Sequence, residues 1–299
     1  MASIESGTGS GTVLGQQFTK SVIESIGPKA SPRLREVMAS LIQHIHDFAR
    51  EVELTTDEWM AGVQLINAAG QMSNDKRNEG QLLCDVIGLE SLVDDITFSA
   101  AAKKTNGLTA SAILGPFWRR DTPRRQNGST IALDMPPDGR AVYMHGKVSD
   151  VDTGKPLVSA SLDVWQASTN GLYEQQDPEQ REYNLRGIFQ TDARGRYAFY
   201  CLKPTAYPVP TDGPAGQLLQ KMDRQVFRPA HIHLMVQADG YKPLTTQIFD
   251  KYCQYLGEDS VFAVKDELSV EFVPREGDSQ AGLQLEYNVT LKRADVEET

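Results

Sequence analysis

The sequence predicts a mainly β fold with a helical N-terminal part, in which an all-α segment precedes a β-sandwich. Residues 13–110 contain segments whose apolar side chains recur every three or four positions, as on one face of a helix. Residues 111–299 contain short alternating segments rich in Val, Tyr, Phe and Thr, separated by Gly, Pro and Asp turns, which is typical of a sandwich or barrel. Residues 1–12 are rich in Gly and Ser, which predicts disorder.

Three stretches of the N-terminal part predict helices. Residues 33–50 place apolar side chains at helical spacing, at Leu34, Val37, Leu41, Ile45 and Phe48. Thr56 or Asp57 can cap the next helix through a side-chain oxygen. Residues 80–100 predict at least one more helix, with Gly88 as the point where it would break.

The remaining segments predict strands joined by turns such as DTGKP and DARGR. The predicted strands cover residues 141–150, 160–168, 197–204, 231–237, 245–249 and 283–293. Two connections between them, 174–186 and 203–226, are long, and long loops in compact domains usually carry function.

Charge and cysteine usage limit the classes of partner and compartment. The net charge of −10 argues against nucleic acid or an anionic membrane as the partner. Cys84, Cys201 and Cys253 are scattered without a CxxC pair, which indicates reduced thiols and a cytoplasmic location. The first residues lack the basic and apolar regions of a signal peptide, and no apolar run approaches the ~20 residues of a membrane span.

Two of the five histidines stand one residue apart in the apolar run FRPAHIHLMV. Because alternate residues of a strand point to the same face, His231 and His233 present two imidazoles side by side. They form either a metal site or a pair satisfied within the core. His44 and His46 have the same spacing on a helix, where they point to different faces and read as structural. His145 reads as an ordinary strand histidine.

Several donors could complete a metal site with this pair. A three-histidine zinc hydrolase site would need His145, and a His/His/carboxylate iron site would need an Asp or Glu at a strand end. Tyrosine phenolate is a hard, anionic donor that suits Fe(III). Tyr173 follows the turn STNG, and Tyr207 precedes a proline that holds it extended on a stiff loop.

Four motifs then carry a resemblance to a known family. HGKVSDVDTGKPLVSASLDVWQASTNGLY, at 145–173, resembles the signature of intradiol ring-cleavage dioxygenases, the non-haem ferric enzymes of aromatic degradation. LGPFWRRDTP, LKPTAYPVPTDGPAGQLL and RPAHIHLMVQADGYKPLTTQIF continue the match in the family's order. The resemblance implies cleavage of an aromatic diol or triol with O2 between its two hydroxyl-bearing carbons.

The resemblance also implies the roles of individual residues. The protein ligands of Fe(III) would be Tyr173, Tyr207, His231 and His233. Displaced from iron as a phenolate, Tyr207 would also accept a substrate proton. Arg228 would stabilise carbanion character on the substrate, and Gln247 would orient the substrate or a water.

Substrate choice within the family follows from the helical part and the implied pocket wall. Protocatechuate enzymes lack such a helical part, so residues 30–105 favour the catechol and hydroxyquinol branch. The wall implied for that branch consists of Leu92, Asp95, Ile113, Pro116, Phe117, Phe262 and Ala263. Asp95 could accept a hydrogen bond from a third ring hydroxyl, which favours hydroxyquinol over catechol. Alternatively, Asp94 or Asp95 is simply an exposed helix carboxylate.

The same branch implies a homodimer formed through the N-terminal helices, in some members with a bound lipid. The apolar faces of 33–50 and 56–72 are suited to such an interface, or they pack on their own sandwich. Two other functions stay open from the residues alone. One is a β-sandwich that binds a metal or small molecule without turnover, and the other is a zinc hydrolase built on the histidine pair.

Overall fold

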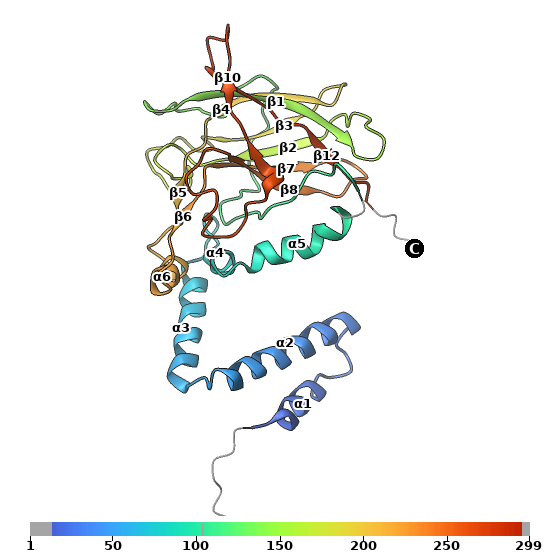
Figure 1. The fold of residues 1–299 in the computed structure, drawn as a ribbon, viewed down its shortest axis with the longest axis vertical. Coiled ribbons are helices and arrows are strands. Elements are labelled where there is room, and N and C mark those ends of the chain that lie inside the picture. The colour runs from blue at the N-terminus through green and yellow to red at the C-terminus, as the bar shows by residue number, and fades with distance from the viewer. Residues whose placement is uncertain (1–13, 103–104, 295–299) are drawn as a thin grey trace, which may run out of the picture. The chain divides into compact units, whose positions relative to one another are not determined.

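The computed structural model describes residues 14–102 and 105–294 (Figure 1), so the predicted disorder at 1–12 lies outside the described residues. Contacts divide the chain into two compact units, one ending at Leu65 and the other beginning at Ile66. This division differs from the predicted boundary at residue 110, because the helices just before that boundary group with the strands.

The predicted helices are present, and a short one precedes them. The helices are α1 (Gln16–Glu24), α2 (Pro32–Glu51), α3 (Thr56–Met72), α4 (Glu79–Val86) and α5 (Leu89–Ala102). Ser31 caps α2 by accepting a hydrogen bond from the backbone N–H of Leu34. Gly88, with a φ of 76°, stands between α4 and α5, as the sequence predicts.

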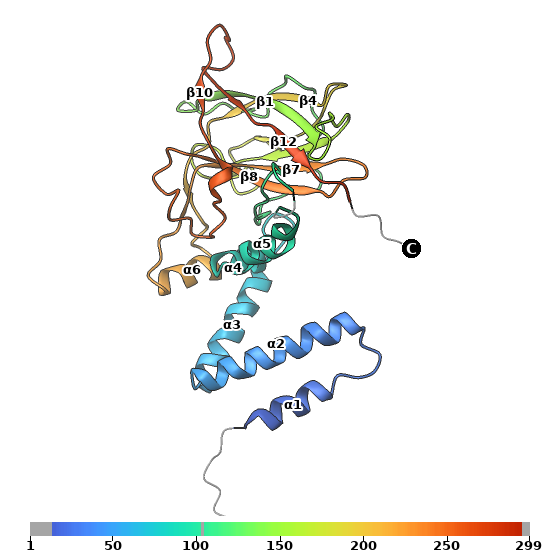
Figure 2. The ribbon, with the colours of Figure 1, turned by 45° about the vertical axis from the view of Figure 1, so that its right-hand side comes forward.

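Two five-stranded sheets make up the predicted sandwich. One sheet contains β1 (Ala141–Asp150), β4 (Arg196–Leu202), β10 (Val273–Pro274), β11 (Leu283–Glu286) and β12 (Val289–Leu291). The other has the order β3–β2–β7–β8–β9, with β3 (Arg186–Gln190), β2 (Ser161–Trp165), β7 (His231–Gln237), β8 (Leu244–Asp250) and β9 (Ser269–Val270). In both ribbon views, α5 runs beside the sheet that contains β7 and β8 (Figures 1 and 2).

Strand alternation decides which side chains enter the core between the sheets. In β7, the fully buried Ile232, Leu234 and Val236 belong to the main hydrophobic cluster of the sandwich. His231 and His233 therefore point to the opposite, outer face of the sheet. The same alternation places Trp165 of β2 and Gln247 of β8 on that outer face, because their neighbours Val164 and Ile248 lie in the core.

Besides β3, β9 and β10, which the sequence does not predict, three further segments differ from the sequence prediction. The long connection 203–226 contains β5 (Tyr207–Pro208) and a helix, α6 (Pro214–Lys221), and β5 pairs with β6 (Phe227–Arg228). The single strand predicted at 283–293 is divided into β11 and β12, which pair with different parts of β1. A 3-10 turn, η1 (Asp266–Leu268), precedes β9.

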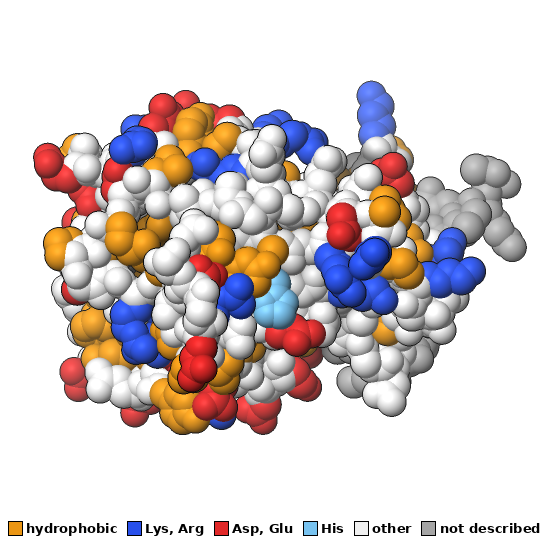
Figure 3. Space-filling view, turned by 90° about the horizontal axis from the view of Figure 1, so that it is seen from above, with side chains coloured by type: hydrophobic (Ala, Val, Ile, Leu, Met, Phe, Trp, Pro, Cys, Tyr) orange, Lys and Arg blue, Asp and Glu red, His pale blue; other side chains and the backbone are white. Residues whose placement is uncertain are grey.

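The surface carries charges of both signs. On the face drawn in Figure 3, Lys and Arg side chains lie among Asp and Glu side chains. Within residues 14–102 and 105–294, the helices are too short or too polar for a membrane crossing.

Asp163 is a buried carboxylate on the outer face of β2. Its side chain accepts a hydrogen bond from Trp118 Nε1 at 2.9 Å. Burial raises the pKa of this carboxyl from 3.8 to about 6, so the folded protein holds the proton more tightly than the unfolded chain. Ionisation of Asp163 therefore lowers the free energy of unfolding. This loss is absent below the pKa that Asp163 has in the unfolded chain, and it reaches about 3 kcal/mol above the pKa that it has in the folded protein.

Replacing Asp163 with asparagine removes this charge and keeps an acceptor for Trp118. We expect the substitution to raise the free energy of unfolding more at pH 8 than at pH 5, with a difference of about 1 kcal/mol. Denaturant titrations of both proteins at both pH values measure this difference. The same effect at pH 5 and pH 8 would show that ionisation of Asp163 is not its cause.

Candidate metal and substrate site

Four predicted donor side chains converge on the outer face of the sheet of β7 and β8. Tyr173 Oη lies 3.0 Å from Tyr207 Oη, and Tyr207 Oη lies 3.4 Å from His231 Nε2. His231 Nε2 lies 3.2 Å from His233 Nε2. All four side chains are buried, with at most 5% of their surface exposed. Two imidazoles from β7 therefore meet one phenol from a loop and one from the short strand β5.

The protonation and orientation of the two imidazoles suit metal binding. His231 Nδ1 donates to the carbonyl of Pro229 at 2.7 Å, so its Nε2 keeps a lone pair directed toward the other donors. Burial lowers the pKa of both imidazoles well below the ordinary value, which keeps them neutral. The ring of His233 stacks on Trp165, with centroids 4.7 Å apart.

Two glycines allow the backbone of neighbouring loops to lie close to these rings. Gly115, in the LGPF motif, has a φ of 72°, and a Cβ there would lie 3.3 Å from His233 Cε1. Gly171 has a φ of 80°, and its Cβ would lie 2.8 Å from Tyr207 Cβ. Larger residues at both positions would adopt a strained backbone and crowd a donor side chain.

Arg228 is a buried cation beside the four donors. Its Nη1 donates to His231 Nε2 at 3.0 Å, and its Nη2 donates to Gln247 Oε1 at 2.7 Å. Gln247 Nε2 in turn donates to the carbonyl of Ile113, so this side chain holds Arg228 in place. Burial alone would lower the pKa of Arg228, but the ion pair with Asp259 raises it above the ordinary value.

This donor set fits one metal ion. Two neutral imidazoles and two phenols, 3.0–3.4 Å from their neighbours, are close enough to share one ion at bond lengths of about 2 Å. Phenolate donors favour a hard ion such as Fe(III). A three-histidine zinc site does not form, because His145 lies on the other sheet, in a surface groove with Lys147 and Glu286.

Of the second histidine pair, His44 is exposed on α2 and His46 has a structural environment, as the sequence predicts. His46 Nδ1 lies 3.0 Å from Thr19 Oγ1, and its ring stacks on Phe18 with centroids 5.5 Å apart. Both contacts join α1 to α2. This pair takes no part in the donor cluster.

The structure places only some of the predicted wall residues at this site. A small cavity of about 10 Å³ lies beside the donors, and it is lined by Leu82, Asp85, Pro116, Phe117, Tyr207, Val209, Pro210, Arg228, His233 and Val261. Ile113 and Ala263 are buried in the apolar cluster that contains Leu82. Leu92, Asp95 and Phe262 are exposed and do not line this pocket; Asp95 lines another pocket, with Phe98 and Leu244.

Asp85 is the carboxylate that the sequence reasoning missed. It lies on α4, one helix before Asp95, and exposes 1% of its surface. Its Oδ1 finds no hydrogen-bond donor among the described residues. Burial and the neighbouring Glu90 raise its pKa well above the ordinary value. The apolar spacing in residues 80–100 predicts these helices. The break at Gly88 separates them, so Asp85 on the first helix faces the pocket and Asp95 on the second does not.

Comparisons with known proteins give the family of the chain. Residues 31–105 match the family described as catechol dioxygenase N terminus, and residues 113–293 match the family described as dioxygenase. The intradiol ring-cleavage dioxygenase prcA of Aspergillus niger is 52% identical over 274 residues, covering 92% of this chain and 87% of that protein. A catechol 1,2-dioxygenase of Candida albicans is 51% identical over 260 residues, covering 87% and 84%.

A solved structure extends the similarity to the fold. Hydroxyquinol 1,2-dioxygenase from Pseudomonas putida has a TM-score of 0.79 and 38% identity, covering 93% of this chain and 98% of that chain. The resemblance carried by the four motifs is thus confirmed, and the molecule is an enzyme rather than a binding module without turnover. Members of the family act on aromatic diols with O2 and are known for non-haem iron. This chain belongs to the intradiol ring-cleavage dioxygenases.

Proposed function

We propose that this enzyme binds Fe(III) through Tyr173, Tyr207, His231 and His233 and cleaves the ring of hydroxyquinol between its two adjacent hydroxyl-bearing carbons. The observation that carries the proposal is the convergence of these four donors beside a pocket that contains the buried carboxyl of Asp85. A bound ferric ion would supply Lewis acidity to the two adjacent hydroxyl groups of the substrate and would activate its ring toward O2.

The side chains of the chain manage protons and charge around that substrate. Tyr207, which the metal would hold as a phenolate, accepts at Oη a proton from one of the two adjacent substrate hydroxyls, because it stands before Pro208 and lines the pocket. Arg228 stabilises negative charge that develops on the ring, since its guanidinium is fixed by Gln247 and Asp259. Gln247 uses both ends of its amide on Arg228 and Ile113, so it orients the arginine.

Asp85 supports hydroxyquinol as the substrate. Its carboxyl interrupts an otherwise apolar wall formed by Leu82, Pro116 and Val261. A third ring hydroxyl would give its buried Oδ1 the hydrogen-bond partner that the protein does not provide. Catechol is the second candidate, because the Candida albicans relative at 51% identity carries that name. Catechol would leave this oxygen without a partner.

The test compares kcat/KM for hydroxyquinol and catechol in the wild type and in Asp85→Ala. We expect the wild type to prefer hydroxyquinol, and we expect the substitution to reduce that preference about 10- to 100-fold, as for a lost hydrogen bond to a charged or buried group. Asp95→Ala is the matched control, because Asp95 is an exposed carboxylate outside this pocket. A wild type that prefers catechol, or a change in preference from Asp95→Ala alone, contradicts the assignment.

We also propose a homodimer formed through the N-terminal helices. Helix α2 carries an exposed apolar stripe at helical spacing, formed by Leu34, Val37, Leu41, Ile45 and Phe48. Each of these side chains exposes at least 43% of its surface. A single-chain mass by light scattering at micromolar concentration would contradict this proposal.

The state of the cysteines supports a cytoplasmic location. Cys84, Cys201 and Cys253 are all free thiols. Free thiols persist in a reducing compartment, so we propose that the enzyme works there. Detection of the enzyme in a secreted or luminal fraction of its host would contradict this location.

A further inference from the structure

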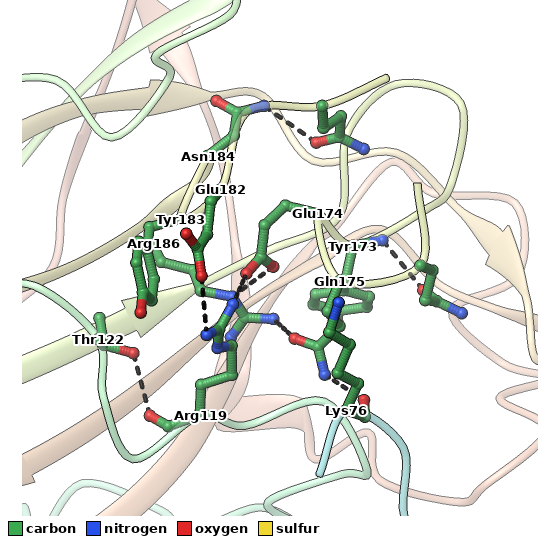
Figure 4. Close-up of polar contacts among 12 residues, drawn as sticks. Lys76, Arg119, Thr122, Tyr173, Glu174, Gln175, Glu182, Tyr183, Asn184 and Arg186 are labelled. Atoms are coloured by element: carbon green, nitrogen blue, oxygen red, sulfur yellow. Dashed lines mark hydrogen bonds and ion pairs between the residues drawn. The ribbon is translucent and has the colours of Figure 1, made fainter. Parts of the chain in front are cut away.

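A buried ionic network lies directly beside Tyr173 (Figure 4). Arg186, the first residue of β3, exposes 1% of its surface. Its Nε donates to Glu174 Oε2 at 2.6 Å, and its Nη2 donates to Gln175 Oε1. The other oxygen of Glu174 accepts from Arg119 Nη1 at 2.8 Å. The two residues that follow Tyr173 in the chain are therefore anchored to a buried cation.

Two arginines share the buried carboxylate of this network. Glu174 is shared by Arg119 and Arg186. Arg119 has further partners in Asp121 and Glu182, whereas Glu174 is the ion-pair partner of Arg186 among the described residues. Buried ion pairs often stabilise a fold no more than apolar residues of similar volume would. Unlike apolar packing, such a network provides a fixed charge and holds the loop in a fixed direction.

Tyr173 lies between this network and the donor cluster. The guanidinium carbon of Arg186 is 5.8 Å from the centroid of the Tyr173 ring, within the range of roughly 6 Å for a cation–π contact. Phe117 stacks on the same ring, with centroids 4.8 Å apart. The ring is thereby held between a cation and an aromatic side chain, with its Oη 3.0 Å from Tyr207 Oη.

We propose that Arg186 is a positioning residue for Tyr173, which fixes the direction of this ligand and places a positive charge beside its ring. The inference rests on the proposed metal site, in which Tyr173 binds as a phenolate. Nearby positive charge stabilises the electrons of a phenolate. It therefore raises the energy needed to transfer one of them to a ferric ion.

The test is the variant Arg186→Met, which keeps the length of an apolar stem and removes the charge. We expect its affinity for iron to fall about 10- to 100-fold, as for other residues that orient metal ligands. We also expect the phenolate-to-iron absorption band to move to longer wavelength. Metal titration and visible spectra of the loaded protein measure both effects independently of turnover.

Two further variants separate the charge from general damage to the network. Arg119→Met loosens the same carboxylate, but the guanidinium of Arg119 lies over Tyr183, 4.3 Å from its centroid, so the band should not move. Arg186→Lys keeps the charge and loses the two-pronged contact with Glu174 and Gln175. We expect it to keep the wild-type band position and to bind iron less tightly than the wild type.

Specific outcomes overturn the inference. One is an Arg186→Met variant with the absorption band position and the iron affinity of the wild type. The other is an equal shift of the band in Arg186→Met and Arg119→Met. If Arg186→Met does not fold, wild-type iron affinity in Arg186→Lys overturns it. A wild-type protein that binds no iron would instead overturn the proposed metal site, and the inference with it.

Discussion

Replacing His231 with alanine is expected to abolish stoichiometric iron binding and, with it, ring cleavage. His231 Nε2 is the donor that lies near both Tyr207 Oη and His233 Nε2, at 3.4 and 3.2 Å. The hydrogen bond from Nδ1 to Pro229 makes Nε2 the unprotonated nitrogen that can bind a metal. Loss of such a donor should weaken iron binding by at least about 100-fold, more than loss of a residue that only orients a ligand. Elemental analysis and visible absorbance of the purified protein measure this loss.

His145→Ala is the matched control for this experiment. His145 is also a strand histidine, but it lies on β1 in the other sheet and lines a surface groove. Its substitution should leave iron content and turnover at wild-type levels. Full iron content in His231→Ala would remove His231 from the ligand set, and loss of iron in His145→Ala would point to a different site.

The histidine pair shows what strand periodicity can predict. The spacing of His231 and His233 places both on one face, and the apolar residues between and after them identify the other face as the core. The structure bears this out, since Ile232 and Leu234 pack between the sheets. Local pattern is sufficient here because the side-chain period of a strand is fixed by its backbone.

The wall carboxylate shows where local pattern fails. Asp85 and Asp95 both lie in the helical stretch 80–100, and both carry a carboxylate of the kind expected to contact a substrate hydroxyl. Only the tertiary packing of α4 against the sandwich directs Asp85 into the pocket, while Asp95 stays exposed. Asp259, which pairs with Arg228, and Arg186, which pairs with Glu174, are likewise contacts between distant segments that no spacing rule joins.

A substitution can distinguish Tyr207, the proposed proton acceptor, from Tyr173, the phenol that stays a metal ligand. We expect Tyr207→Phe to keep iron, because Tyr207 is the ligand that the proposed mechanism releases when substrate binds, and to lose the group that accepts a substrate proton. The expected result is a fall in kcat/KM of about 10²- to 10⁴-fold, the range typical of a lost general base. The slowed step should be formation of the complex with the diol under anaerobic conditions, which stopped-flow absorbance resolves.

Tyr197→Phe is the control for removal of a buried tyrosine hydroxyl. Tyr197 is fully enclosed in the sandwich core, and its hydroxyl donates to the carbonyl of Tyr287 at 2.6 Å. Its loss should lower stability without slowing the binding of substrate, since it is remote from the donor cluster. If Tyr207→Phe retains iron and binds substrate at the wild-type rate, the proton acceptor is another group. If Tyr207→Phe loses iron, Tyr207 serves chiefly to hold the metal, and its role as the base is withdrawn.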